Sequence, residues 1–158
     1  MKEKFSKRVQ SIIKQSKEEA IELGHSYVGS EHILLGLLKV NSGKGKKILD
    51  VFNINISEMI NSINTKIKTS GGTLNLGHLP LTRRAERILR NSYHEASSRG
   101  DSISDDVHLL LAMLKEPEGV ASRVLKSFSL DYETVSDLII SDDGSYLVEE
   151  LDGEKNIK

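Results

Sequence analysis

The sequence contains two copies of one pattern, related by a shift of 76 residues. Aligning each residue with the one 76 positions later keeps residues 5–63 in register with residues 81–139 without a gap. Of the 59 aligned pairs, 16 are identical, and they include a glycine, histidine and leucine signature: Gly24/Gly100, His32/His108, Leu34/Leu110 and Leu38/Leu114. This register indicates a tandem duplication, and two copies favour a closed pseudo-twofold pair over an open solenoid.

The composition predicts an aliphatic core. The chain has 158 residues, of which 37% are apolar, with four Tyr, three Phe and no Trp. This length suits one domain in which both copies share a core. We expect a single domain over residues 1–141, made of repeat one (5–68), a linker (69–80) and repeat two (81–141), followed by an acidic polar tail or linker at 142–158.

Apolar residues recur at helical spacing through both copies. Ser6 is placed to cap the first helix, and Gly24 suits the left-handed turn that ends it. Ser30 is expected to cap the second helix, with Glu31 in the first turn, where a carboxylate favours the helix dipole. The predicted fold is all-α, with eight helices in two tandem four-helix repeats, at 7–23, 30–38, 46–52, 57–67, 83–99, 106–114, 120–128 and 132–140.

Charge and composition argue against several classes of partner. The formal net charge of -1 provides no long-range attraction to nucleic acid or to an anionic membrane. The chain has no Cys, no apolar segment near the ~20 residues needed to span a bilayer, and no signal-peptide pattern at its N-terminus. We therefore expect a cytoplasmic, monomeric domain that binds neither nucleic acid nor membrane.

The sequence offers little for catalysis or metal binding. Residues 42–47 carry glycines and lysines but lack the spacing of a phosphate-binding Walker A loop, so we expect no ATP hydrolysis by this domain. His32 and His108 recur at matching positions, each alone on an apolar helix, whereas metal sites need three or four converging ligands. We predict that each is a buried histidine at a helix start that bonds to the backbone of its own repeat, and that the domain holds no metal.

The two predicted helix starts combine an apolar residue, a hydroxyl and basic residues. As local structure, Phe5 with Ser6 and Leu81 with Thr82 form a hydrophobic staple and a cap. As a binding feature, the same residues form an anion site with an apolar ledge, found twice. Glu31 also has two interpretations. Its carboxylate stabilises the first turn of a helix, and it could equally bind a cationic ligand group.

The duplicated residues resemble a known family. The stretch from Glu18 to Leu38 closely resembles the first N-terminal repeat of the Clp unfoldases, in particular the ClpC branch. The residues 5–8 and 81–85 resemble the starts of that family's two repeats, and the resemblance covers residues 5–140. It implies a non-enzymatic domain that binds substrate polypeptides and adaptor proteins, without a cofactor of its own. In such proteins separate ATPase rings bind ATP and Mg and thread proteins into a ClpP-type protease.

The resemblance also implies specific site residues. ClpC proteins of Gram-positive type bind phosphoarginine in two pockets, each using a hydroxyl at the first helix start and a Glu before the His. Carried over by position, the first pocket would use Ser6 with Glu31, and the second Thr82 with Val107. Val107 lacks the carboxylate, and losing such a charged hydrogen bond costs ~1.5 to 3 kcal/mol, or more than about tenfold in affinity, with Asp105 and Asp106 as the nearest substitutes. The predicted ligand- or adaptor-binding residues are Phe5, Ser6, Glu31, Leu81, Thr82 and Arg83.

Two other functions remain open from the sequence. The first is a stand-alone accessory protein of the same fold that docks on a Clp complex. The second is a hydrolase that uses Glu31 and His32, which requires a third polar group converging on them. No such group is evident in the sequence, so a Clp-type recognition domain is the main prediction.

Overall fold

The computed structural model describes residues 4–40, 42–67 and 79–139. Within these ranges the chain forms eight α-helices and no β-sheet, which confirms the predicted all-α class. The helices are α1 (Lys7–Glu22), α2 (Ser30–Val40), α3 (Gly43–Val51), α4 (Ile56–Lys66), α5 (Arg83–Ser98), α6 (Asp106–Lys115), α7 (Val120–Ser127) and α8 (Tyr132–Leu138). The predicted tail at 142–158 and most of the predicted linker at 69–80 lie outside the described residues.

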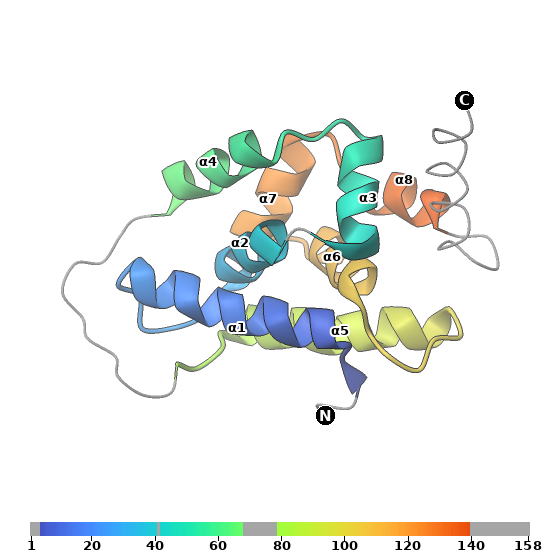
Figure 1. Cartoon of the computed structure of the whole chain (residues 1–158), viewed down its shortest axis with the longest axis horizontal. Helices are drawn as coiled ribbons and strands as arrows, with labels where there is room; N and C mark the ends of the chain where they lie inside the picture. The colour runs from blue at the N-terminus through green and yellow to red at the C-terminus, as the bar shows by residue number, and fades with distance from the viewer. Residues whose placement is uncertain (1–3, 41, 68–78, 140–158) are drawn as a thin grey trace.

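The second helix of each repeat forms the centre of the molecule. Figure 1 shows α2 and α6 between α1 and α5 on one side and α3, α4 and α7 on the other. Every residue from His32 to Leu38 and from Asp106 to Leu114 is buried. In the described residues the buried apolar side chains are aliphatic or Met, as the composition predicted, and each buried Leu or Ile contributes about 1.5–3 kcal/mol.

The two repeats are interlocked. Helix α2 packs on α5 and α7 of the other repeat as well as on α1 and α4 of its own, and α3 packs on α6. Two isolated parallel bridges join the repeats, one between Phe5 and Ser104 and one between Val28 and Leu81. Because these four positions correspond under the 76-residue shift, the bridges are pseudo-twofold equivalents. Each places the start of a repeat's first helix beside the start of the other repeat's second helix.

Two helix starts differ from the sequence prediction. Helix α3 begins at Gly43, three residues before the predicted Lys46, because Gly43 adopts φ +87° and the Gly45 N–H donates to the buried Asp106 carboxylate at 2.8 Å. Helix α4 begins at Ile56, where Asn55 rather than Ser57 is the cap and accepts from the Glu58 N–H at 3.0 Å. The remaining described ends lie within two or so residues of those predicted.

The described part of the chain contains no helix that is both long and apolar enough to cross a membrane.

Candidate functional site at the paired helix starts

Each bridge between the repeats creates a polar cluster where two helices begin. The first helix-start site consists of Ser6, Arg8, Asp105 and Asp106, where α1 and α6 begin. The second helix-start site consists of Thr82, Arg84, Gly29, Ser30 and Glu31, where α5 and α2 begin. The backbone fixes each pair of starts, since the Ser6 N–H donates to the Ser104 carbonyl and the Thr82 N–H to the Val28 carbonyl, both at 2.9 Å.

Both hydroxyl caps form as predicted. The Ser6 Oγ accepts from the Val9 N–H at 3.1 Å, and the Thr82 Oγ1 accepts from the Ala85 N–H at 3.0 Å. Each cap has φ near -65° and extended ψ, the backbone that an N-cap requires. The interpretation of these residues as helix caps is therefore confirmed. Because each hydroxyl oxygen acts as an acceptor in its cap, the hydroxyl proton remains available for a further acceptor.

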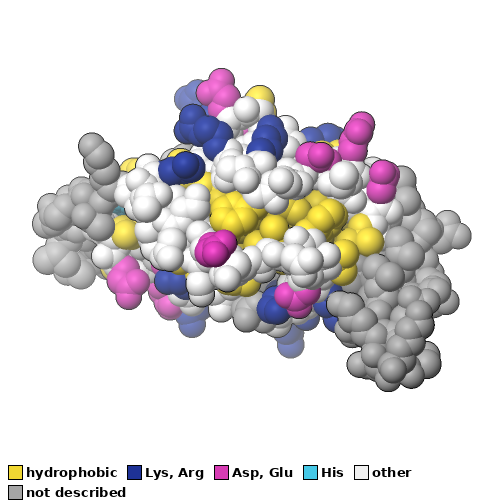
Figure 2. Space-filling view, turned by 90° about the horizontal axis from the view of Figure 1, so that it is seen from above, with side chains coloured by type: hydrophobic (Ala, Val, Ile, Leu, Met, Phe, Trp, Pro, Cys, Tyr) yellow, Lys and Arg dark blue, Asp and Glu magenta, His cyan; other side chains and the backbone are white. Residues whose placement is uncertain are grey.

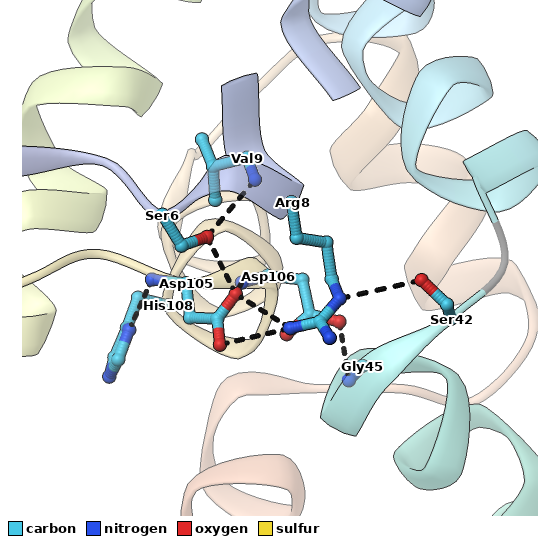
Figure 3. Close-up of polar contacts among 8 residues, drawn as sticks. All are labelled: Ser6, Arg8, Val9, Ser42, Gly45, Asp105, Asp106 and His108. Carbon is cyan, nitrogen blue, oxygen red and sulfur yellow. Dashed lines mark hydrogen bonds and ion pairs between the residues drawn. The ribbon is translucent and has the colours of Figure 1, made fainter. Parts of the chain in front are cut away.

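In the first helix-start site, that acceptor belongs to the chain itself (Figure 3). The Asp105 carboxylate receives hydrogen bonds from the Ser6 hydroxyl at 2.8 Å, the Asp106 N–H at 2.8 Å and the Arg8 guanidinium at 3.1 and 3.2 Å. Burial alone would raise the pKa of Asp105, but the bonds from Ser6 and the Asp106 N–H, with the Arg8 charge, hold that pKa below its ordinary value. Asp105 is therefore a carboxylate held in place by three donors.

Asp106 lies beneath this carboxylate and is only 1% exposed. Its Oδ2 accepts from the Gly45 N–H at 2.8 Å, while its Oδ1 is buried without a hydrogen-bond partner among the described residues. Burial, and then the neighbouring Asp105 charge, raise the pKa of Asp106 to about 6. Asp106 of repeat two thus caps α3 of repeat one, although burying its charged carboxylate is electrostatically unfavourable.

The reciprocal contact exists in the second helix-start site but is neutral. The hydroxyl oxygen of Ser30, the equivalent of Asp106, accepts a hydrogen bond from the Ala121 N–H in the first turn of α7, at 3.5 Å. Ser30 therefore serves a helix of the other repeat and is not the cap of α2 that the sequence predicted. Each repeat thus supplies a polar side chain to the first turn of the other repeat's third helix.

In the second helix-start site, the polar side chains do not serve as hydrogen-bond partners for one another. Gly29 stands where the first site has Asp105, and the half-buried Glu31 carboxylate folds over it, with an oxygen only 2.7 Å from where a Cβ would be. Among the described residues, the Glu31 carboxylate accepts no hydrogen bond and the Thr82 hydroxyl donates none. The Arg84 Nε is buried without a hydrogen-bond partner in that same part of the chain, and lies 3.7 Å from Glu116.

The structure corrects how the predicted residues pair. By position, Ser6 was expected beside Glu31 and Thr82 beside Val107, each within its own repeat. Instead Ser6 contacts Asp105 of repeat two, and the Thr82 N–H bonds to Val28, in the segment that leads to Glu31 of repeat one. The first helix of each repeat begins beside the second helix of the other repeat. Glu31 therefore belongs with Thr82, in the second helix-start site.

The other predicted residues have mixed outcomes. Phe5 and Leu81 are half-buried and pack against the core, so they support the bridges structurally. Arg83 is exposed, and the neighbouring Arg84 is the arginine at the second site. Sequence reasoning missed Arg8 and Arg84 as site residues, although both are identical between the copies, and that identity was the available signal.

The arginine side chains explain two glycines that occur at equivalent positions of the two repeats. Gly43 and Gly119 have φ of +87° and +115°, and a side chain at either would collide with Arg8 or Arg84 respectively. A left-handed backbone and a close approach both favour glycine here. The start of each third helix is thereby open enough for an arginine to reach its site.

The histidines confirm the predicted structural role. The His32 Nδ1 accepts from the Gly29 N–H at 2.9 Å, which leaves its Nε2 to donate to the His25 Nδ1 at 2.7 Å. Burial, followed by the proximity of His25, lowers the pKa of His32 to about 4. The His108 Nδ1 likewise accepts from the Asp105 N–H at 2.9 Å. A hydrolase using Glu31 and His32 is disfavoured, since both ring nitrogens of His32 are engaged.

No group of three or more metal-ligating side chains is assembled within residues 4–40, 42–67 and 79–139.

A separate apolar face lies on the far side of α2 and α6. Figure 2 shows apolar side chains gathered on the face that looks up in Figure 1, where α3, α4 and α7 lie. The partly buried apolar residues on and beside these helices include Phe52, Ile54, Ile56, Ile60, Val120 and Phe128. A half-exposed apolar surface of this kind is compatible with contact to another protein.

Taken together, these features define a class: an all-α domain of two interlocked four-helix repeats with a polar site at each exchanged helix start. The chain belongs to the Clp repeat N-terminal domain family, whose model matches residues 4–128 and, in a second match, 81–143. The expected family is thereby confirmed.

Similar curated proteins are much longer. The chain is 36% identical over 140 residues to chaperone protein ClpC2, chloroplastic, of Arabidopsis thaliana, and to chaperone protein ClpC1, chloroplastic, of Oryza sativa subsp. japonica. Each alignment covers 89% of this chain but only 15% of the relative. The chain thus corresponds to a small part of those proteins.

Solved structures show the same fold at lower identity. The N-terminal domain of the chaperone ClpD from Arabidopsis thaliana matches with a TM-score of 0.67 and 19% identity, over 85% of this chain and 91% of that one. The Hsp104 N-terminal domain from Candida albicans matches with a TM-score of 0.70 and 17% identity, over 94% and 91%.

Proposed function

We propose that this domain captures substrate polypeptides or adaptor proteins for an ATP-dependent Clp unfoldase that feeds a ClpP-type protease. Membership of the Clp repeat N-terminal domain family supports a place in such a chaperone. The second helix-start site supports a binding role, because it gathers a hydroxyl, a guanidinium and a carboxylate that do not satisfy one another. The apolar face over α3, α4 and α7 is a second surface suited to protein contact.

We propose phosphoarginine as the ligand of the second helix-start site. Its guanidinium would pair with the Glu31 carboxylate, a charge-assisted contact. Its phosphoryl oxygens would accept from the Thr82 hydroxyl, the Arg84 guanidinium and the N-terminal N–H groups of α2. The single observation that supports this proposal is the hydrogen bond from the Thr82 N–H to the Val28 carbonyl, which brings Thr82 to the segment that leads into Glu31. Among the described residues, the Thr82 hydroxyl donates no hydrogen bond and the Glu31 carboxylate accepts none.

The test is a calorimetric titration of the domain with phosphoarginine. We expect one saturable site, and we expect Glu31→Ala and Thr82→Ala each to weaken it by more than about tenfold, since each removes a hydrogen bond to a charged group. Thr82→Ser should retain binding because it keeps the hydroxyl. Absence of heat at millimolar ligand would overturn phosphoarginine recognition.

Matched controls come from the start of α4. Asn55→Ala removes an N-cap and Glu58→Ala removes a first-turn carboxylate, as the test variants do, but neither residue touches a helix-start site. Both variants should bind phosphoarginine like the wild type. Equal losses in these controls would assign the effect of Thr82→Ala and Glu31→Ala to fold destabilisation and contradict the proposed contact.

A further inference from the structure

The two helix-start sites differ most at one position, the residue just before the first site's Asp106 and the second site's Ser30. This residue is Asp105 in the first site and Gly29 in the second, and the 76-residue shift aligns the two. The surrounding donors are retained, since Ser6 corresponds to Thr82 and Arg8 to Arg84. The donors of the two sites are therefore similar, while three consecutive positions differ: Asp105 against Gly29, Asp106 against Ser30, and Val107 against Glu31.

The Asp105 carboxylate occupies the place that an incoming anion would take. Its Oδ1 is bonded to the Ser6 hydroxyl and the Asp106 N–H, both at 2.8 Å, and the Arg8 guanidinium reaches both of its oxygens. A hydroxyl, a helix N-terminus and an arginine are the donors that bind phosphate groups in proteins. An external anion must displace a carboxylate that is covalently tethered and therefore always present at high local concentration.

The neighbouring Asp106 carboxylate adds to the electrostatic barrier against an incoming anion. Asp106 is buried, accepts from the Gly45 N–H, and places a second carboxyl group beside Asp105. The second helix-start site has the neutral Ser30 at that position. A dianionic ligand entering the first site would therefore meet two acidic groups where the second site has a glycine and a hydroxyl.

We propose that Asp105 is a resident anion that keeps the first helix-start site closed to anionic ligands, so that the domain presents one anion site instead of two. The inference deepens the proposed function by assigning ligand binding to the second helix-start site alone. The identity of residue 105 then sets the number of anions that the domain binds at its helix starts.

The test uses inorganic phosphate as the probe and backbone amide shifts as the readout. In the wild type, the amides of Ser30 and Glu31 should shift on titration, while those of Asp106 and Val107 should stay unchanged. In Asp105→Gly, which copies Gly29, the amides of Asp106 and Val107 should also shift and saturate, with affinity at least about tenfold above the wild type at that site. Phosphate shifts at Asp106 in the wild type, or none there in a folded Asp105→Gly, would overturn the inference.

The reciprocal variant covers the case in which Asp105→Gly does not fold. Gly29→Asp places a carboxylate in the second site, where the three atoms nearest to the new Cβ all belong to the carboxyl end of the Glu31 side chain. It should weaken phosphate binding at Ser30 by more than about tenfold while leaving the amides of the first site unchanged. Unaltered phosphate binding by a folded Gly29→Asp would contradict the role of a resident carboxylate.

Failure of the inference and failure of the proposed function give different results. If the wild type does not bind phosphoarginine but Asp105→Gly gains phosphate shifts at Asp106, phosphoarginine recognition is refuted and the resident anion stands. If the wild type binds phosphoarginine with shifts at both helix starts, recognition stands and the resident anion is refuted. If phosphate shifts neither helix start in either protein, the inference is refuted as well.

Discussion

Replacing Asp106 by Asn should make the domain more stable at pH 7.5. Asp106 is 1% exposed, and its Oδ1 has no hydrogen-bond partner in the described part of the chain. Burial and the adjacent Asp105 raise its pKa from 3.8 to about 6, a difference that corresponds to an upper limit of about 3 kcal/mol. Asn keeps an oxygen for the Gly45 N–H and removes the charge, so we expect a gain of about 1 to 3 kcal/mol.

The sign of the effect follows from proton linkage. The folded state binds the Asp106 proton more tightly than the unfolded chain does, so the favourable contribution of this group is fully present below pH 3.8. It is lost as the pH rises through about 6, where the folded protein must hold a buried carboxylate. The advantage of Asp106→Asn should therefore be large at pH 7.5 and vanish near pH 4.

Urea unfolding at the two pH values measures the effect, with Asp137→Asn on the exposed side of α8 as a matched control. Taking the difference from the wild type at each pH cancels the groups that titrate alike in both proteins. If Asp106→Asn destabilises the domain equally at both pH values, Asp106 acts as an ionised cap whose charge is favourable, and the reasoning from burial is refuted.

Three further predictions address packing, protonation and the site. Gly36→Ala should lower stability by about 1 to 2 kcal/mol and the melting temperature by about 2 to 8 °C, because its Cβ would lie 2.6 Å from the Ile12 carbonyl oxygen on α1; a rise, as helix propensity alone predicts, would contradict this. As the pH falls from 6.5 to 4, the free energy of unfolding of His32→Asn should decrease less than that of the wild type. The reason is that the wild-type fold lowers the pKa of His32 from 6.5 to about 4, so the unfolded chain takes up this proton first. Parallel pH profiles of the two proteins would contradict this. Gly119→Ala should weaken phosphoarginine binding, since φ is +115° and the Cβ would lie 2.7 Å from the Arg84 Cδ; unchanged affinity would show that Arg84 is not needed.

Local patterns in the sequence were sufficient for most of the helices. The hydroxyl caps Ser6 and Thr82 and the left-handed Gly24 act within a few residues, so their effect can be read without a structure. The start of α3 could not be read this way. Its first-turn N–H at Gly45 is satisfied by Asp106 of the other repeat, a contact 61 residues away in sequence.

The composition of the sites also depended on tertiary structure. Assigning Ser6 to Glu31 assumed that each repeat closes on itself, whereas the bridges through Ser104 and Val28 exchange the helix starts. Repeat identity marked Arg8 and Arg84, but only the fold brings Arg8 to Asp105. A duplicated sequence thus predicts which residues are equivalent, and the structure is needed to decide which equivalent residues meet.

A double-mutant cycle between Ser6 and Asp105 tests the exchange of helix starts most directly. Ser6→Ala, Asp105→Asn and the double variant would be compared by urea unfolding, beside a second cycle between Ser6 and Glu31→Gln. Since the Ser6 hydroxyl donates to Asp105 at 2.8 Å, we predict a coupling of about 1 to 2 kcal/mol in the first cycle and none above about 0.3 kcal/mol in the second. Coupling of Ser6 to Glu31 without coupling to Asp105 would show that each repeat forms its own site and would contradict this account.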